Sequence, residues 1–305
     1  MIPVGSVLVT GGGGFVGTEL CGSLAGRGWD VRSEPLRLMT EPAKWQATLR
    51  STHCVVHLAA RAHQMRADPD AETAYHQINV EGSRFVAEQA ANAGVRRFVF
   101  LSSIKVNGEG GALPYRATDV PDPRDPYGRS KLAAEQVIRE VCARTHMEWV
   151  VIRPPLVYGP GVKANFRKLM RLVDLGIPLP LGSIENRRSL VGLTNLVHFI
   201  ETCMVHRGAA GQVWLIADDE CISTPELVNR LSQHMNHRAR LFSFSPVWLR
   251  RLAATFHARG EFDRLCSSLQ VDASPARVQL GWHPTRSLDG ELARTVAAFR
   301  AGGHR

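Results

Sequence analysis

A tyrosine and a lysine lie four residues apart in the stretch DPYGRSK, at Tyr127 and Lys131. Asp125 is a good N-cap residue and Pro126 a good first residue of a helix, so the two side chains should share one helix face. A free tyrosine has a pKa near ~10, and a neighbouring ammonium would lower it toward neutral pH. The pair could therefore exchange a proton with a hydroxyl or carbonyl, although this spacing is also common on ordinary surfaces.

Glycines follow the first apolar segment, Ser6 to Thr10, in the stretch TGGGGFVG. Gly11, Gly14 and Gly17 are three residues apart, between an expected strand and an expected helix. Glycine allows a tight turn and a close approach of backbone amides to a pyrophosphate, which the helix N-terminus stabilises. A flexible turn is the alternative, but the context favours a dinucleotide, whose oxidised nicotinamide ring would also lower the pKa of Tyr127.

The end of the second expected strand should distinguish NAD from NADP. In WDVRSEPLRLMTEP, Arg32 and Arg37 could bind a 2′-phosphate, Glu34 could bind a free ribose, or all three could lie in a solvated loop. We favour NADP over NAD. The segment from Asp30 to Cys54 is short for a strand, a helix and another strand, so the adenine side should be unusual.

Apolar segments alternate with helical patterns along the first half of the chain, which predicts an α/β fold with a Rossmann-type doubly wound parallel sheet. We expect strands at 6–10, 54–60, 96–103 and 148–159, and helices at 78–93 and 127–144. Residues 1–162, with returns near 186–220, should form the NAD(P)-binding domain. Residues 163–305 should form mainly a smaller, mostly helical substrate lobe.

The composition is that of a globular protein, with 305 residues, 44% hydrophobic and 21% charged. The six cysteines form no C-x-x-C pair, and His53 and His57 are too far apart on a strand to share an ion, so no disulfide framework and no metal is expected. No apolar run could span a bilayer, which suggests a cytoplasmic protein. The net charge is +9, but the arginines are dispersed, so we expect an anionic small substrate and neither a nucleic acid nor a membrane as partner.

Several further motifs occur in a specific order: VVHLAA, INVEGS, FLSS, YGRSK, RPPLVYGPG, RRSLVGLTNLV and LGWHP, after TGGGGFVG. This series resembles the extended short-chain dehydrogenase/reductase superfamily, the NAD(P)-dependent epimerases, dehydratases and reductases of nucleotide sugars. The resemblance covers nearly the whole chain. It implies a homodimer as the expected oligomer.

The resemblance also implies site residues. Tyr127 matches the catalytic acid/base, Lys131 the lysine that lowers its pKa, and Ser103 the catalytic hydroxyl. Ser103, Asn165 and Arg188 match substrate-binding positions, although Asn165 would equally suit a helix-start cap. With Tyr127 and Lys131, the expected cofactor-binding residues are Gly11, Gly14, Phe15, Val16, Gly17, Arg32, Arg37, Leu58, Ala59, Ala60, Asn79, Ser102, Arg153 and Pro154.

The residues after Ser103 narrow the reaction. Ile104 and Lys105 stand where the family's 4,6-dehydratases carry an Asp-Glu pair, which argues against that chemistry. The stretch from Lys163 to Val191 most resembles bacterial reductases of UDP-4-keto-6-deoxy-N-acetylhexosamine in polysaccharide biosynthesis. A UDP-hexose or UDP-N-acetylhexosamine 4-epimerase is the alternative, and a silent NAD(P)-binding interaction module is a third hypothesis that the intact Ser103, Tyr127 and Lys131 disfavour.

Overall fold

A six-stranded parallel sheet forms the framework of the protein in a computed structural model that describes residues 5–35, 42–61, 70–255 and 259–302. The strand order is β2-β1-β3-β4-β5-β8, and every neighbouring pair is parallel. The order reverses between β1 and β3, and such folds bind ligands at the carboxyl ends of the strands at this switch point. The strands are β1 (Ser6–Thr10), β2 (Asp30–Glu34), β3 (Cys54–His57), β4 (Arg97–Leu101), β5 (Glu148–Arg153) and β8 (Gln212–Leu215).

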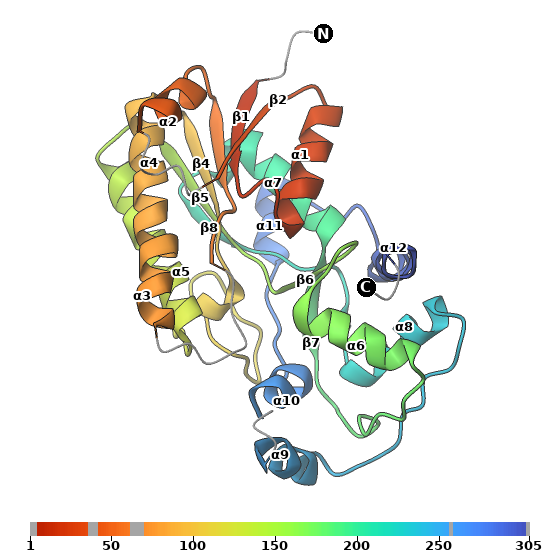
Figure 1. Ribbon diagram of the computed structural model, residues 1–305. Coiled ribbons are helices and arrows are strands. Elements are labelled where there is room, and N and C mark those ends of the chain that lie inside the picture. Colours follow the sequence, from red (N-terminus) through yellow and green to blue (C-terminus); the bar gives the residue numbers. More distant parts are fainter. Residues whose placement is uncertain (1–4, 36–41, 62–69, 256–258, 303–305) are drawn as a thin grey trace.

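Helices cover both faces of this sheet (Figure 1), which confirms the doubly wound α/β fold. One face packs on α1 (Phe15–Gly26), α7 (Leu193–Val205) and α11 (Ser274–Leu280), and the other on α2 (Pro42–Leu49), α4 (Gly82–Asn92) and α5 (Pro126–Ala143). Strand side chains alternate between the two layers: Val7 and Val9 lie in the first core cluster and Leu8 in the second. Because both faces are buried, the strands are continuous apolar runs in the sequence.

The sheet ends at β2. After β2 the chain passes through α2 and returns to the other side of β1 as β3, so no strand lies outside β2 among the described residues. The segment from Asp30 to Cys54 was expected to be short for a strand, a helix and another strand, but it holds β2, α2 and the start of β3. The unusual feature on this side is therefore the sheet edge at β2.

A second, smaller sheet has three strands. It has the order β6-β7-β9, with β6 (Leu156–Tyr158), β7 (Arg188–Gly192) and β9 (Cys221–Ile222). The segment 148–159, expected as one strand, is thus two strands in different sheets. Pro154 and Pro155 separate them, since proline has no N–H for a strand ladder.

The helices around the second sheet are α6 (Ala164–Asp174), α8 (Thr224–His234), α9 (Pro246–Thr255), α10 (Arg259–Cys266) and α12 (Leu288–Ala301). The remaining helical elements are α3 (Ala71–Tyr75), the π-helix η2 (His76–Glu81) and the 3-10 turns η3 (Ile104–Val106) and η4 (Arg207–Ala209). The helix expected at 78–93 therefore starts earlier, since α3, η2 and α4 follow one another from Ala71. The domain boundary at residue 162 stays a prediction.

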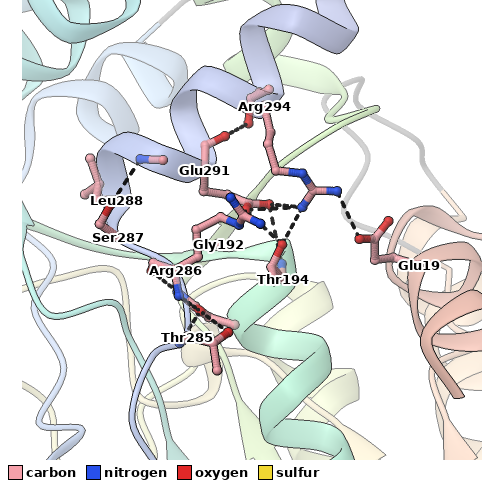
Figure 2. A network of polar contacts seen from close by, with 12 residues as sticks. Glu19, Gly192, Thr194, Thr285, Arg286, Ser287, Leu288, Glu291 and Arg294 are labelled. Atoms are coloured by element: carbon pink, nitrogen blue, oxygen red, sulfur yellow. Dashed lines mark hydrogen bonds and ion pairs between the residues drawn. The ribbon is translucent and has the colours of Figure 1, made fainter. Parts of the chain in front are cut away.

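A polar network joins the last helix to the layer that covers the first sheet (Figure 2). Glu291 of α12 is fully buried, and one of its carboxylate oxygens accepts a hydrogen bond of 2.8 Å from the Thr194 hydroxyl of α7. Arg294 of α12 also donates to Thr194 and lies 3.2 Å from the Glu19 carboxylate of α1. These contacts fix α12 against both α1 and α7.

Candidate active site

Ser103 and Tyr127 lie together where β4 and α5 meet. Ser103 follows β4, and its hydroxyl accepts a hydrogen bond of 3.2 Å from the backbone N–H of Lys105. Tyr127 is the second residue of α5, whose N-cap is Asp125, as predicted; its carboxylate accepts from the Gly128 N–H at 2.7 Å. A hydrogen bond links the Ser103 and Tyr127 side chains. The structure therefore joins the two predicted proton-handling groups directly.

Lys131 lies one turn further along α5 and is 1% exposed. Its Nζ is 4.1 Å from the centroid of the Phe100 ring, a cation–π contact. Burial lowers the pKa of Lys131 to about 7, while the nearby Glu135 carboxylate acts in the opposite sense. An amine with this pKa can be protonated or neutral near pH 7.

The pKa of Tyr127 moves in the direction opposite to the expected one. Burial raises the pKa of Tyr127 to about 12, and the Asp125 carboxylate and Tyr75 add to this effect. The hydrogen bond with Ser103 lowers it. The groups of the protein thus favour a neutral phenol, because burial and a neighbouring anion both disfavour the phenolate.

The glycine loop has the shape that a diphosphate needs. Gly11 has a φ of 74°, and a Cβ atom there would lie 2.8 Å from the Ala59 backbone nitrogen, where the loops after β1 and β3 meet. A Cβ atom on Gly17 would lie 2.2 Å from the Gly11 carbonyl oxygen. Gly14 is the N-cap of α1 and provides no side chain, and the first turn, which contains Phe15 and Val16, has no acidic residue. Free N–H groups of this helix end can therefore receive an anion.

The end of β2 does not support the predicted role of Arg32. The Arg32 guanidinium donates to the Asp30 carboxylate and to the Thr48 and Arg50 carbonyl groups, each at 2.8 Å. Arg32 therefore joins β2 to the end of α2, and its binding of a 2′-phosphate stays a prediction. Glu34 is the last residue of β2, beside Thr10 of β1.

Arg37, the other predicted contact for a 2′-phosphate, lies outside the described residues.

The predicted wall after β3 is held by a set of buried polar contacts. The backbone N–H groups of Leu58 and Ala59 donate to the carbonyl group and the hydroxyl of Thr10, respectively, and Ala60 follows them. Asn79 accepts from the Arg61 N–H at 2.7 Å.

The amide nitrogen of Asn79 donates to the Ser130 hydroxyl of α5 at 2.9 Å. Asn79 therefore connects the wall to the helix that carries Tyr127.

Ser102 and Arg153 are used inside the protein. The Ser102 hydroxyl donates to Glu135 of α5 at 2.5 Å, and the Arg153 guanidinium makes two contacts with the same carboxylate at 2.9 and 2.6 Å. Another Arg153 nitrogen donates to the Asn107 side chain at 3.0 Å. These side chains hold α5 against β4 and β5, and the predicted contacts of Ser102 and Arg153 with the cofactor stay predictions. A contact through Pro154 stays a prediction.

A cavity of about 390 Å³ connects this region to the second sheet and its helices. Ser103 and Tyr127 line it from one side, and Asn165 and Arg188 from the other. The Oδ1 atom of Asn165 is buried and has no hydrogen-bond partner among the described residues. Asn165 is also not a cap, because the N-cap of α6 is Lys163.

Arg188 is partly buried in this cavity. Its guanidinium donates to the Ser267 carbonyl group at 2.8 Å, and burial lowers its pKa. A guanidinium held in this way remains a donor for a phosphate group.

Lys105 of the cavity and Tyr75, which contacts Tyr127, had no predicted role. Lys105 pairs with Glu109 at 2.7 Å and with Asp125 at 2.5 Å, so an ammonium occupies the place of a dehydratase acid. The ring of Tyr75 lies edge-on to Tyr127, with 5.9 Å between centroids. The sequence marked Lys105 only as a departure from the dehydratase pattern, and no motif singled out Tyr75.

The part of the chain that the structure describes contains no cluster of three or more His, Cys, Asp or Glu side chains that could hold a metal ion. None of its helices is long and apolar enough to cross a membrane.

The chain shares sequence and fold with known nucleotide-sugar enzymes. The UDP-glucose 4-epimerase of Vibrio cholerae is 42% identical to it, over 98% of this chain and 97% of that protein. The structure of MoeE5 in complex with UDP-glucuronic acid and NAD has a TM-score of 0.79, with 25% identity over 98% of this chain and 100% of that one. The Thermotoga maritima UDP-glucose 4-epimerase with UDP-glucose has the same fold, with a TM-score of 0.78 at 21% identity over 97% and 99% of the two chains. Residues 7–217 match the NAD dependent epimerase/dehydratase family, and the chain belongs to this family.

Proposed function

We propose that the protein is an NAD-dependent 4-epimerase of a UDP-sugar. The observation that carries this proposal is the cavity that brings Ser103 and Tyr127 together with Arg188. The first two residues can move a proton at a sugar hydroxyl, and the guanidinium can bind a diphosphate. The relative with 42% identity over nearly the whole chain supports epimerisation as the reaction.

In this proposal the residues of the chain have separate roles at C4 of the sugar. NAD, when bound, supplies the hydride acceptor and donor. Tyr127 takes the proton from the C4 hydroxyl and returns it, and Ser103 holds the oxygen by a hydrogen bond. Lys131, next to Tyr127 on α5, provides positive charge and a donor for the cofactor ribose.

Substrate binding is assigned to the opposite wall of the cavity. Arg188 would hold the diphosphate, and Asn165 would offer its buried Oδ1 acceptor to a donor of the substrate. With this division, residues 1–162 and the returns at 186–220 would bind the dinucleotide, and residues 163–305 mainly the UDP-sugar. A homodimer is the oligomer we expect, and sedimentation velocity measures it.

We propose NAD over NADP as the coenzyme. Glu34 stands at the end of β2, where an acidic residue binds a free ribose, and Arg32 is engaged by Asp30 and two carbonyl groups. This replaces the preference for NADP drawn from the sequence. Fluorescence titration should therefore show tighter binding of NADH than of NADPH.

The 4-ketoreductase interpretation uses the same Ser103 and Tyr127 and remains the second candidate. Its support is the resemblance of the stretch from Lys163 to Val191, whereas the 42% relative favours epimerisation. In an epimerase, the 4-keto sugar must rotate within the cavity so that the hydride returns to the opposite face of C4. A reductase releases the product of one transfer.

Two assays separate these candidates. Incubation with UDP-glucose or UDP-N-acetylglucosamine should give the C4 epimer without net consumption of NADH, and Tyr127→Phe should lower this rate ~10²–10⁴-fold. Stoichiometric oxidation of NADH or NADPH by a UDP-4-keto sugar, without epimer formation, would show the reductase instead. If the protein binds NAD but shows neither epimerisation nor reduction, the silent NAD-binding module would be the remaining hypothesis.

A further inference from the structure

Large hydrophobic side chains are exposed on α9, at the end of α6, and in the segments that follow α6 and precede α9. Figure 1 shows α9 at the end of the protein away from β1 and β2. Of the twelve such residues that are exposed among the described ones, seven come from two segments. The exposed fraction reaches 57% at Trp248 and 61% at Val247. The seven are Leu172, Leu175, Ile177, Phe242, Phe244, Val247 and Trp248, which we call the docking surface.

Backbone hydrogen bonds place the two segments side by side. The Leu179 N–H donates to the Arg240 carbonyl group at 2.8 Å, and the Phe242 N–H donates to the Leu179 carbonyl group at 3.1 Å. Leu179 and Leu241 are themselves buried or half-buried in the core, so the neighbouring Phe242 faces outward. The two segments therefore lie next to each other, and both expose large apolar side chains, as interaction sites do.

The second segment and α9 lie in a positively charged stretch of the sequence, whereas the first segment has Asp174 between Leu172 and Leu175. From Leu227 to Gly260 the chain has six arginines and no aspartate or glutamate, so this stretch carries +6 of the net charge of +9. The arginines are therefore less dispersed than expected, and positive charge is concentrated in the stretch that carries Phe242, Phe244 and Trp248.

The arginines nearest to the exposed phenylalanines are available to a partner. Arg238 and Arg240 are exposed, and their side chains make no ion pair or hydrogen bond among the described residues. By contrast, Arg250 pairs with Asp263 at 3.0 Å, and Arg251 lies 4.9 Å from the centroid of the Trp248 ring. Arg238 and Arg240 are therefore the cations that can attract an anionic partner.

We propose that the docking surface binds the surface of an anionic lipid bilayer. Peripheral proteins are held on such bilayers by two forces, burial of apolar side chains at the headgroup level and attraction of basic residues to acidic lipids. The exposed tryptophan and phenylalanines provide the first force, and Arg238 and Arg240 the second. The proposal revises the expectation of no membrane partner and is independent of the proposed reaction.

Binding in this way would also orient the active site. A second hollow, of about 770 Å³, is lined by Pro246, Val247 and Arg250 of α9. It shares Lys105 and Glu109 with the cavity that holds Ser103 and Tyr127. A bilayer against α9 would therefore lie next to one approach to that cavity.

The electrostatic part is tested by sedimentation with vesicles of equal parts phosphatidylcholine and phosphatidylglycerol. The full chain should bind them, bind pure phosphatidylcholine weakly, and be released by salt. Arg238→Glu with Arg240→Glu should weaken binding about thirtyfold or more, since each basic residue near the surface contributes about fivefold. The matched control, Arg96→Glu with Arg144→Glu, makes the same change of net charge on another face and should weaken binding less than about threefold.

The apolar part is tested with lipids that carry bromine on their acyl chains. They should quench the fluorescence of the wild-type protein, and Trp248→Phe should remove most of this quenching. Of the other tryptophans, Trp45, Trp214 and Trp282 are buried, and the half-buried Trp29 and Trp149 belong to the first sheet and its helix layer, outside the docking surface. Phe244→Ser with Trp248→Ser should lower vesicle binding at least tenfold. Leu113→Ser, at an exposed residue elsewhere, should not. Circular dichroism and NADH binding serve as folding checks for each variant.

Three outcomes would overturn the proposal. One is absence of binding to the phosphatidylglycerol vesicles at low salt. Another is equal loss of binding in the two arginine double variants, which would mean that net charge alone acts. The third is a dimer in sedimentation velocity that Phe244→Ser with Trp248→Ser dissociates while vesicle binding stays the same, which would assign the surface to a second copy of the chain.

Discussion

Replacing Lys131 with methionine should make the protein more stable and less active near neutral pH. The buried ammonium has a pKa lowered from 10.5 to about 7. This difference corresponds to ~4–5 kcal/mol of unfavourable free energy for the charged form in the folded protein. Loss of the cation–π contact with Phe100 offsets ~1–2 kcal/mol of the stability gained by removing the charge. Methionine fills a similar volume, so no large cavity is expected. The expected net gain in unfolding free energy is ~2–4 kcal/mol.

The gain should depend on pH in a defined direction. The pKa of Lys131 is lower in the folded than in the unfolded protein, so the cost of its burial is fully present below about pH 7. As the pH rises from about 7 toward 10.5, the folded protein carries neutral amine, and the cost disappears. Urea unfolding of wild type and Lys131→Met at about pH 6, 7.5 and 9 should show a stability difference that shrinks with rising pH.

Lys44→Met provides the control, because Lys44 is exposed on α2 and lies outside the site. Its unfolding free energy should stay within ~0.5 kcal/mol of wild type at each pH. The turnover of Lys131→Met should fall ~10²-fold or more, since the charge next to Tyr127 is lost. A Lys131→Met protein that is less stable than wild type at about pH 7, or a difference that does not change with pH, would refute the reasoning.

Two further predictions concern the supports of the site. Glu135→Gln should cost ~3–5 kcal/mol in urea unfolding, because it leaves the buried Arg153 without its counter-charge. Glu220→Gln, in an exposed ion pair, should cost less than ~1 kcal/mol, and equal costs would contradict the assignment. Gly17→Ala should lower NADH affinity more than tenfold, since a Cβ atom would lie 2.2 Å from a loop carbonyl oxygen. Gly22→Ala on the same helix meets no atom within 4 Å and should keep the affinity while gaining ~0.5–1 kcal/mol, and unchanged affinity in both variants would argue against the loop as the diphosphate site.

The elements of the sheet layers could be predicted because their signals are local. Asp125 and Pro126 set the start of α5, and buried apolar runs mark parallel strands. The split of 148–159 was missed, since an apolar run does not tell which sheet a strand joins. A pair of prolines within such a run is the signal that would have shown the break.

The positions of site residues were predictable where a short motif fixes their spacing, and not where segments distant in the sequence come together. The spacing of Tyr127 and Lys131 gave their common helix face. The contacts of Arg32 were not predicted, because the carbonyl groups that accept hydrogen bonds from its guanidinium lie sixteen and eighteen residues later. Likewise, the pairing of Lys105 with Asp125 joins residues twenty positions apart, which no local pattern indicates.

Burial shifts Tyr127 and Lys131 in opposite directions, and this links the chemistry to the charge of the cofactor. Their pKa values of about 12 and about 7 mean that moving the phenol proton to the amine costs ~7 kcal/mol within the protein. Neither a lysine four residues away nor the hydrogen bond from Ser103 closes this gap. The oxidised nicotinamide ring carries a positive charge. Placed beside the phenol, this charge would lower the pKa of Tyr127 and reduce its difference from the pKa of Lys131. Tyr127 should thus become a base only when the cofactor can also accept a hydride, so that removal of the proton and of the hydride from the sugar are coupled.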